Sequence, residues 1–277
     1  RYLDEWISKG ILTRLEKAGY YLYEMRFRHP FHGMMLTRLA LWGALKLEPF
    51  ERKVVFPHEH THSTAKEDRA KLLRATHSNF SPIFILYEDS HRALDRVHAA
   101  CARRTPLLDF QDFQNVGHKL WVVDQADDMR SLAQTFEGRR VFIADGHHRY
   151  ETALGYAEER DREEPSPGLQ SWDFVLSAFV KFDDPGLLIL PIHRLVLKNP
   201  SFDKEKLLDA LKQHFVAHRV SRSALERIAE GKMPNGFGLA FSERECYMLE
   251  LKDETTARHA MPSRKPPRWY SLEVNLI

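Results

Sequence analysis

The pattern of apolar and polar positions in the first part of the chain predicts a β-hairpin. Residues 19–27 (GYYLYEMRF) are rich in aromatic side chains and alternate in character, and residues 39–47 (LALWGALKL) form an apolar run. Both patterns are typical of strands, and we expect the second strand to be buried on both faces. Residues 29–33 (HPFHG) contain proline and glycine and predict the turn between the two strands.

The rest of the chain predicts helices and strands in alternation. Thr64 and Glu67 form a capping box, which places a helix start at Ala65 with Leu72, Leu73 and Thr76 on its inner face. Helices are expected over residues 2–16 with a break at Gly10, 65–77, 90–104, 127–137, 149–160, 202–215 and 223–229. Further strands are expected at residues 53–56, 83–87, 118–123, 141–144, 174–180, 216–220, 237–241 and 246–251.

This order of elements predicts an α/β or α+β protein with two parts. The first is a core domain over residues 1–195, and the second is a smaller α+β subdomain over residues 196–277. The chain starts at Arg1 and stops within an apolar stretch at Leu276 and Ile277, so we expect it to lack segments of a longer protein, including the end of the subdomain.

Composition narrows the class of protein. A length of 277 residues with 43% hydrophobic residues is enough for a packed core. The mean hydropathy is −0.47, and no apolar run reaches the ~18 residues of a membrane span. A formal net charge of +2 argues against nucleic acid as the main partner. The two cysteines match no metal or disulfide pattern, which is typical of a cytoplasmic protein.

The strongest chemical signal lies in residues 139–154 (RRVFIADGHHRYETAL). A short strand ends, turns at Asp145 and Gly146, and delivers His147, His148 and Arg149 to the start of a helix. Such a position offers free backbone N–H groups and the positive end of the helix dipole to an anion, and arginine can add a bidentate phosphate contact. Asp145 would hold a metal ion or a hydroxyl group. The alternative is that Asp145 only caps the helix and that the histidines are surface residues.

A second cluster lies in residues 57–69 (PHEHTHSTAKEDR). His58, Glu59 and His62 match the HExxH pattern of zinc proteases, but the capping box begins the helix only after His62, so the two histidines would not share a helix face. In an extended segment His58, His60 and His62 would share one face and could bind a metal or a phosphate. Smaller hints are the pair Thr37 and Arg38, and His193 and Arg194 at the end of a strand near Leu190.

The segments PHEHT, KEDR, SPIF, IADGHHRYETAL and DPGLLILPIHR together resemble the family called domain of unknown function 1015, over nearly the whole chain. That family is similar to the ParB/sulfiredoxin-like fold, which includes a kinase of free serine, sulfiredoxin and the CTP-binding ParB proteins. The resemblance implies a mixed-sheet core in which residues 145–149 form a phosphate-binding corner. The turn carries histidine where sulfiredoxin has its catalytic cysteine, which argues against sulfinic-acid reduction.

The function that this resemblance implies is phosphoryl transfer to a small polar metabolite, with serine as the natural acceptor and with an adenine nucleotide and Mg²⁺ as cofactors. Asp145, His147, His148 and Glu59 would be catalytic, with Glu59 as general base and Asp145 also on the metal. Phosphate would be bound by Gly146, His148, Arg149, Lys66 and Arg69. The pocket would be completed by His58, His60, Asp68, Arg38, His193 and Arg194. The alternatives are a ParB-like nucleotide-binding protein without turnover, regulatory or DNA-associated, and a metal-dependent phosphatase or hydrolase.

Overall fold

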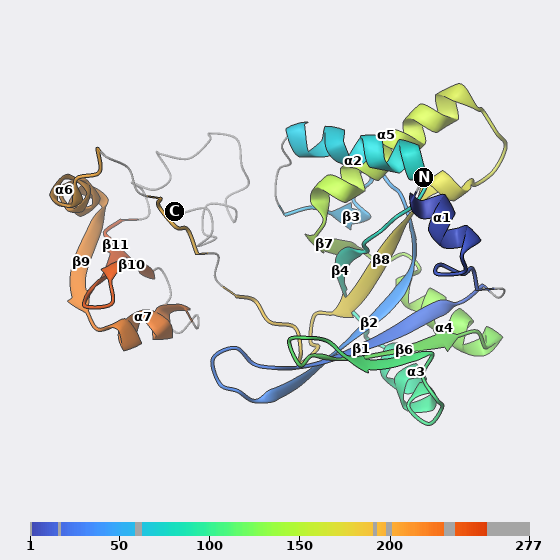
Figure 1. Ribbon diagram of the computed structural model, residues 1–277, viewed down its shortest axis with the longest axis horizontal. Coiled ribbons are helices and arrows are strands. Elements are labelled where there is room, and N and C mark those ends of the chain that lie inside the picture. The colour runs from blue at the N-terminus through green and yellow to red at the C-terminus, as the bar shows by residue number, and fades with distance from the viewer. Residues whose placement is uncertain are drawn as a thin grey trace. The chain divides into compact units, whose positions relative to one another are not determined.

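The computed structural model describes residues 2–15, 18–58, 63–190, 193–197, 201–229 and 236–253, without the side chains of residues 63–66, 229 and 236. Within these ranges the chain divides into two compact units, Arg1–Leu187 and Leu188–Ile277. Both combine helices with a sheet, which confirms the expected α+β class (Figure 1). None of the described helices is long and apolar enough to cross a membrane.

The first unit is built on a mixed sheet of eight strands in the order β3-β7-β4-β8-β2-β1-β6-β5. Only β3–β7 and β4–β8 pair in parallel, and the other neighbours are antiparallel. The strands are β1 (Tyr20–Arg28), β2 (Met35–Lys46), β3 (Val55–Phe56), β4 (Ile83–Tyr87), β5 (Leu108–Gln111), β6 (Gly117–Val123), β7 (Val141–Asp145) and β8 (Phe174–Lys181). The predicted hairpin is confirmed, because β1 and β2 pair from Tyr21 with Trp42 to Arg28 with Met35.

One face of this sheet carries the main core. Leu22, Leu41, Ile85 and Ile143 are buried there beneath residues of three helices. The helices of the unit are α1 (Tyr2–Ser8), α2 (Ser63–Thr76), α3 (Ala93–Cys101), α4 (Ala126–Phe136) and α5 (His147–Glu163), with short 3-10 turns at Phe50–Arg52 and Ser171–Asp173. The buried residues that α3, α4 and α5 contribute include Leu94, Val97, Leu132, Tyr150 and Ala153, so these helices hold the site-bearing strands in place.

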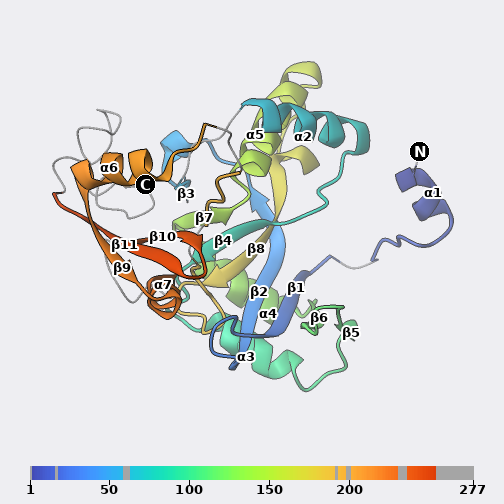
Figure 2. The same ribbon diagram turned by 60° about the vertical axis from the view of Figure 1, so that its left-hand side comes forward.

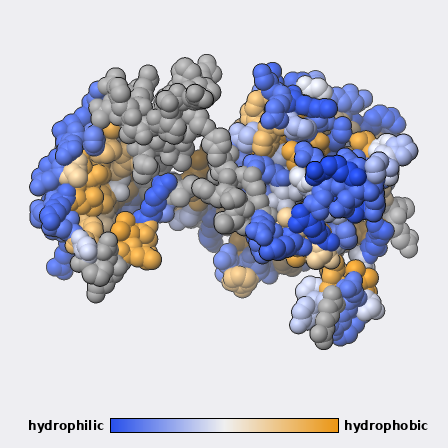
Figure 3. All heavy atoms as spheres, turned by 90° about the horizontal axis from the view of Figure 1, so that it is seen from above, coloured by the Kyte–Doolittle hydropathy of each residue, from blue (hydrophilic) through white to orange (hydrophobic). Residues whose placement is uncertain are grey.

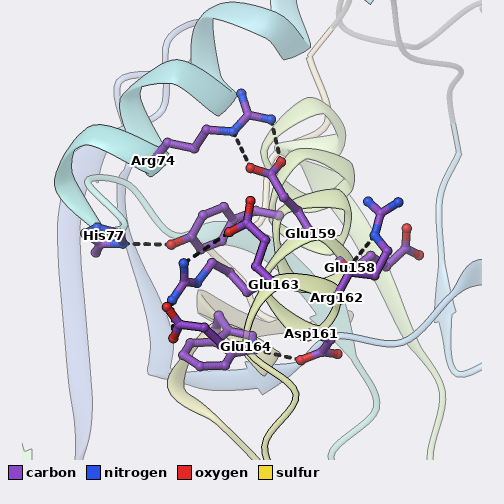
Figure 4. A network of polar contacts seen from close by, with 11 residues as sticks. Arg74, His77, Glu158, Glu159, Asp161, Arg162, Glu163 and Glu164 are labelled. Carbon is purple, nitrogen blue, oxygen red and sulfur yellow. Dashed lines mark hydrogen bonds and ion pairs between the residues drawn. The ribbon is translucent and has the colours of Figure 1, made fainter.

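Helices α2 and α5 lie side by side at one end of the sheet (Figures 1 and 2). The Arg74 guanidinium makes two hydrogen bonds of 2.8 and 2.6 Å to the carboxylate of Glu159, and the His77 ring lies 2.7 Å from the hydroxyl of Tyr156 (Figure 4). Charged side chains cover much of the outer surface of this helix pair (Figure 3). These polar contacts hold α2 against α5.

The second unit has a three-stranded antiparallel sheet in the order β10-β11-β9. Its elements are α6 (Lys204–His214), β9 (Phe215–Val220), α7 (Arg222–Ala229), β10 (Gly236–Ser242) and β11 (Glu245–Leu251). The side chains of Leu208 on α6 and of Cys246 and Leu249 on β11 are buried within this unit. All five elements follow the sequence pattern to within two residues.

Several details of the sequence prediction differ from the structure. Strand β2 is buried on both faces only at its middle, where Leu41 belongs to one core cluster and Ala40 to the other. Leu72 is 40% exposed, because α2 presents Leu73 to the core instead. Helix α2 already includes Ser63, so Thr64 lies inside it and is not its cap. The expected strand leading to His193 is absent from the described residues 187–190, and strand β5 was missed.

Candidate active site at the start of α5

The strongest sequence motif forms a sharp corner between β7 and α5. Gly146 has φ 96° and ψ 23°, a left-handed conformation that glycine adopts without the strain of a side chain. The helix begins directly after it at His147, and the N-cap residue Gly146 has no side chain that could cap it. The first backbone N–H groups of a helix have no partner within the helix backbone. The corner therefore presents backbone N–H groups and the positive end of the helix dipole.

Asp145 stands at this corner with its side chain 76% exposed. One carboxylate oxygen accepts a hydrogen bond of 2.7 Å from Nη2 of Arg149, one turn along the chain. Nη1 of the same guanidinium donates to the carbonyl oxygen of Pro82 at 2.6 Å. Arg149 thus ties Asp145 to the loop before β4 and fixes the direction of an exposed carboxylate.

His58 and His147 face each other on the other side of the turn. Nδ1 of His58 lies 2.7 Å from the carbonyl oxygen of Ile143, which can only accept, so Nδ1 carries the proton and Nε2 has the lone pair in the neutral ring. The backbone N–H of His58 donates to Nε2 of His147 at 3.2 Å, and the two rings meet edge to face with centroids 4.5 Å apart. His147 is 1% exposed, so a bound substrate would reach His58 before His147.

The start of α5 is anchored from below by Tyr150, which is fully buried. Its hydroxyl donates to the carbonyl oxygen of Glu48 at 2.8 Å and accepts from the N–H of Glu48 at 3.0 Å. Burial raises the pKa of this phenol to about 12, so it stays protonated and keeps its donor role at neutral pH. The ring also stacks on Phe50 at 5.4 Å, which makes the corner a rigid part of the core.

Comparison with known proteins places this corner within a family. The sequence pattern of DUF1015, described as a protein of unknown function, matches residues 1–275. The chain belongs to the DUF1015 family. This confirms the resemblance found in the sequence. Neither a curated protein nor a solved structure matches the chain.

The structure brings together only some of the predicted site residues. Asp145, Gly146, His147, His148 and Arg149 share the corner with His58, because β3 and β7 pair in parallel at Val55 with Val141 and so place His58 near Ile143. Asp68 and Arg69 are exposed on α2. Glu59 and His60 lie outside the described residues, as does the side chain of Lys66. His193 and Arg194 are exposed residues of the second unit.

One predicted site residue lies elsewhere, and two groups that hold the site together were not predicted. Arg38 lies on β2 and contacts Met25, Phe27 and Phe84, not the corner motif. The carbonyl groups of Ile143 and Pro82, which hold His58 and Arg149, were missed by the sequence analysis. Backbone acceptors carry no residue-type signal, so only the fold could identify them.

The corner offers a carboxylate of the kind that binds Mg²⁺. The described residues contain no group of three His, Cys, Asp or Glu side chains that could hold a metal ion. Magnesium needs no such group, because it is held by one or two carboxylates together with substrate phosphates and water. Asp145, with its exposed carboxylate, offers that kind of ligand.

Proposed function

We propose that the DUF1015 chain is a phosphoryl-transfer enzyme that moves the terminal phosphate of an adenine nucleotide to the hydroxyl group of a small polar metabolite. The observation that carries the proposal is the corner itself. An exposed, oriented carboxylate and the N-terminus of α5 flank a histidine whose Nε2 carries the lone pair of the neutral ring and can act as a base. Phosphoryl transfer needs mainly positioning and charge stabilisation, and these groups supply both.

The start of α5 would bind the phosphate groups. The backbone N–H groups at the start of α5 would donate to the phosphate, and the helix dipole would favour the charge that develops on the transferred group. Asp145 would hold Mg²⁺, which when bound neutralises phosphate charge. Arg149 keeps that carboxylate in place, and its predicted contact with phosphate remains a prediction.

His58 would act as the general base. Its Nε2 takes the proton of the acceptor hydroxyl while the hydroxyl oxygen forms a bond to the γ-phosphorus. The bond from that phosphorus to the β–γ bridging oxygen breaks, and the nucleoside diphosphate is released. The proton on Nδ1 is held by the carbonyl of Ile143, which fixes the tautomer. His147 is a positioning residue, because it holds the backbone of His58. Serine as acceptor rests on the family resemblance.

Ligand binding to the corner can be tested by thermal unfolding of the full chain with ATP and Mg²⁺. We expect ATP at 100 times its dissociation constant to stabilise the protein by about 2.7 kcal/mol. Asp145→Asn should lose most of that gain, since a neutral amide binds the cation more weakly than a carboxylate does. His32→Gln, in the exposed hairpin turn, serves as a control and should keep it. A screen in which no nucleotide raises the melting temperature of the unmutated protein would remove the proposal.

A further inference from the structure

The sheet of the first unit has a second face with a small core of its own. Ala40, Ala178 and Val180 are buried there, and five partly buried side chains pack around them: Tyr23, Trp42, Phe84, Leu86 and Leu187. All belong to strands except Leu187, and none of the described helices contributes to this cluster. The face is therefore apolar and aromatic, and its polar members stand out.

Arg38 is the cation of this face. Its guanidinium carbon lies 5.2 Å from the ring centre of Phe84 and 6.0 Å from that of Phe27. Nη2 lies 3.5 Å from the sulfur of Met25, which is a weak acceptor. Burial lowers the pKa of the guanidinium, yet arginine keeps its charge at neutral pH.

Within the described part of the chain, no carboxylate lies within ion-pair distance of Arg38. Asp184 acts on it electrostatically, but the two carboxylate oxygens of Asp184 accept hydrogen bonds from the backbone N–H groups of Leu39 at 3.1 Å and Gly186 at 2.8 Å. The N–H donors of a guanidinium lie in its own plane, where they suit a bidentate oxyanion. Arg38 thus has strong donors without a strong acceptor.

A rigid aromatic wall stands beside Arg38. The ring of Tyr23 lies 5.0 Å from Trp42 and 5.9 Å from His118. Nε2 of His118 lies 3.2 Å from the carboxylate of Asp112, so it carries the proton. The hydroxyl of Tyr23 therefore donates to Nδ1 of the same ring, 2.6 Å away. This chain of hydrogen bonds fixes the tyrosine ring against the sheet.

We propose that this face is a second ligand site, in which Arg38 binds the oxyanion of a small molecule, a carboxylate or a phosphate group, and the aromatic wall packs against the molecule's ring. The site is independent of the phosphoryl-transfer proposal, because none of its residues belongs to the corner at α5. A stacked arginine that served packing alone would show no preference for anions.

The probes are phenyl phosphate, benzoate and the neutral benzyl alcohol. Each probe, at millimolar concentration, is observed by saturation-transfer NMR in the presence of the full chain. We expect ring-proton signals from at least one of the two anions and none from the alcohol. The anion that binds identifies the head group. No signal from either anion, or an equal signal from benzyl alcohol, would overturn the proposal.

Variants locate the binding. Arg38→Met keeps an apolar stem between the rings and should abolish the signal, and Arg38→Lys should weaken binding about tenfold because an ammonium group lacks the planar fork. Arg26→Met is the matched control. Arg26 is exposed on β1, next to Met25 but on the opposite face of the sheet, so this variant should bind the anion as the unmutated protein does. Circular dichroism checks that each variant is folded. If Arg38→Met proves to be unfolded, the test rests on Arg38→Lys alone. Unchanged binding in Arg38→Lys, or in a folded Arg38→Met, would refute the role of Arg38.

Discussion

Gly146 is the residue on which the geometry of the corner depends most. Its φ of 96° disfavours any side chain, and a Cβ there would lie 3.0 Å from Nη2 and 3.1 Å from Cζ of Arg149. The turn could be predicted from residue types alone, because an Asp-Gly pair between an expected strand and an expected helix indicates a turn. Residue types could not identify the contact between His58 and His147, which lie 89 residues apart and meet only through the pairing of β3 with β7.

Gly146→Ala should lower the free energy of unfolding by about 2–3 kcal/mol, because backbone strain and the displaced guanidinium both contribute. Gly138→Ala is the matched control, since Gly138 has φ 64° but nothing within 4 Å of an added Cβ, so it should lose only about 1 kcal/mol from backbone strain. Urea unfolding of both variants measures the difference. Equal losses would show that Arg149 moves aside at no cost.

At the level of elements, the sequence predicted most helices and strands because their apolar periodicity is set by burial on one face. Strand β5 was missed because it is only four residues long and fully exposed, so the short alternation in LDFQ was too weak a signal. Leu72 was placed on the wrong side of α2 because the charged α2–α5 contact, through Arg74 and Glu159, sets the orientation of that helix. Polar contacts between helices leave no periodic signal.

The attachment of α5 to the loop after β2 gives a prediction about pH. Tyr150 has its pKa raised to about 12 from an ordinary value of 10.0, so between these pH values the unfolded chain loses this proton and the folded chain keeps it. The folded state then binds more protons than the unfolded state, and stability falls as pH rises through this window. The loss from this group should reach about 2 kcal/mol by pH 12.

Tyr150→Phe removes this titration together with the two hydrogen bonds to Glu48, so it should lower stability at pH 7 by about 1–3 kcal/mol and flatten the decline above pH 10. Urea unfolding at a series of alkaline pH values checks both effects. A parallel decline in the two proteins would show that the phenol is not responsible.

For the whole molecule, the α+β class and the family could both be predicted from the sequence, because each rests on patterns that are local in the chain. The distribution of chemistry over the sheet could not. The sequence grouped Arg38 with the other residues of the phosphoryl-transfer pocket, whereas the structure places it among Phe27 and Phe84, on the sheet face to whose core no described helix contributes. Which face a strand residue occupies depends on register, and register is set by partners that are distant in sequence.

The central claim is phosphoryl transfer at the corner between β7 and α5. Phosphorus NMR tests it most directly, with the full chain incubated with ATP, Mg²⁺ and a mixture of small hydroxyl metabolites that includes serine. We expect the γ-phosphate signal of ATP to decline while a phosphomonoester signal grows. His58→Gln should slow this transfer about 100-fold or more, in line with the loss of a general base, and His32→Gln should leave it unchanged. Unaltered ATP, or release of inorganic phosphate alone, would contradict the account.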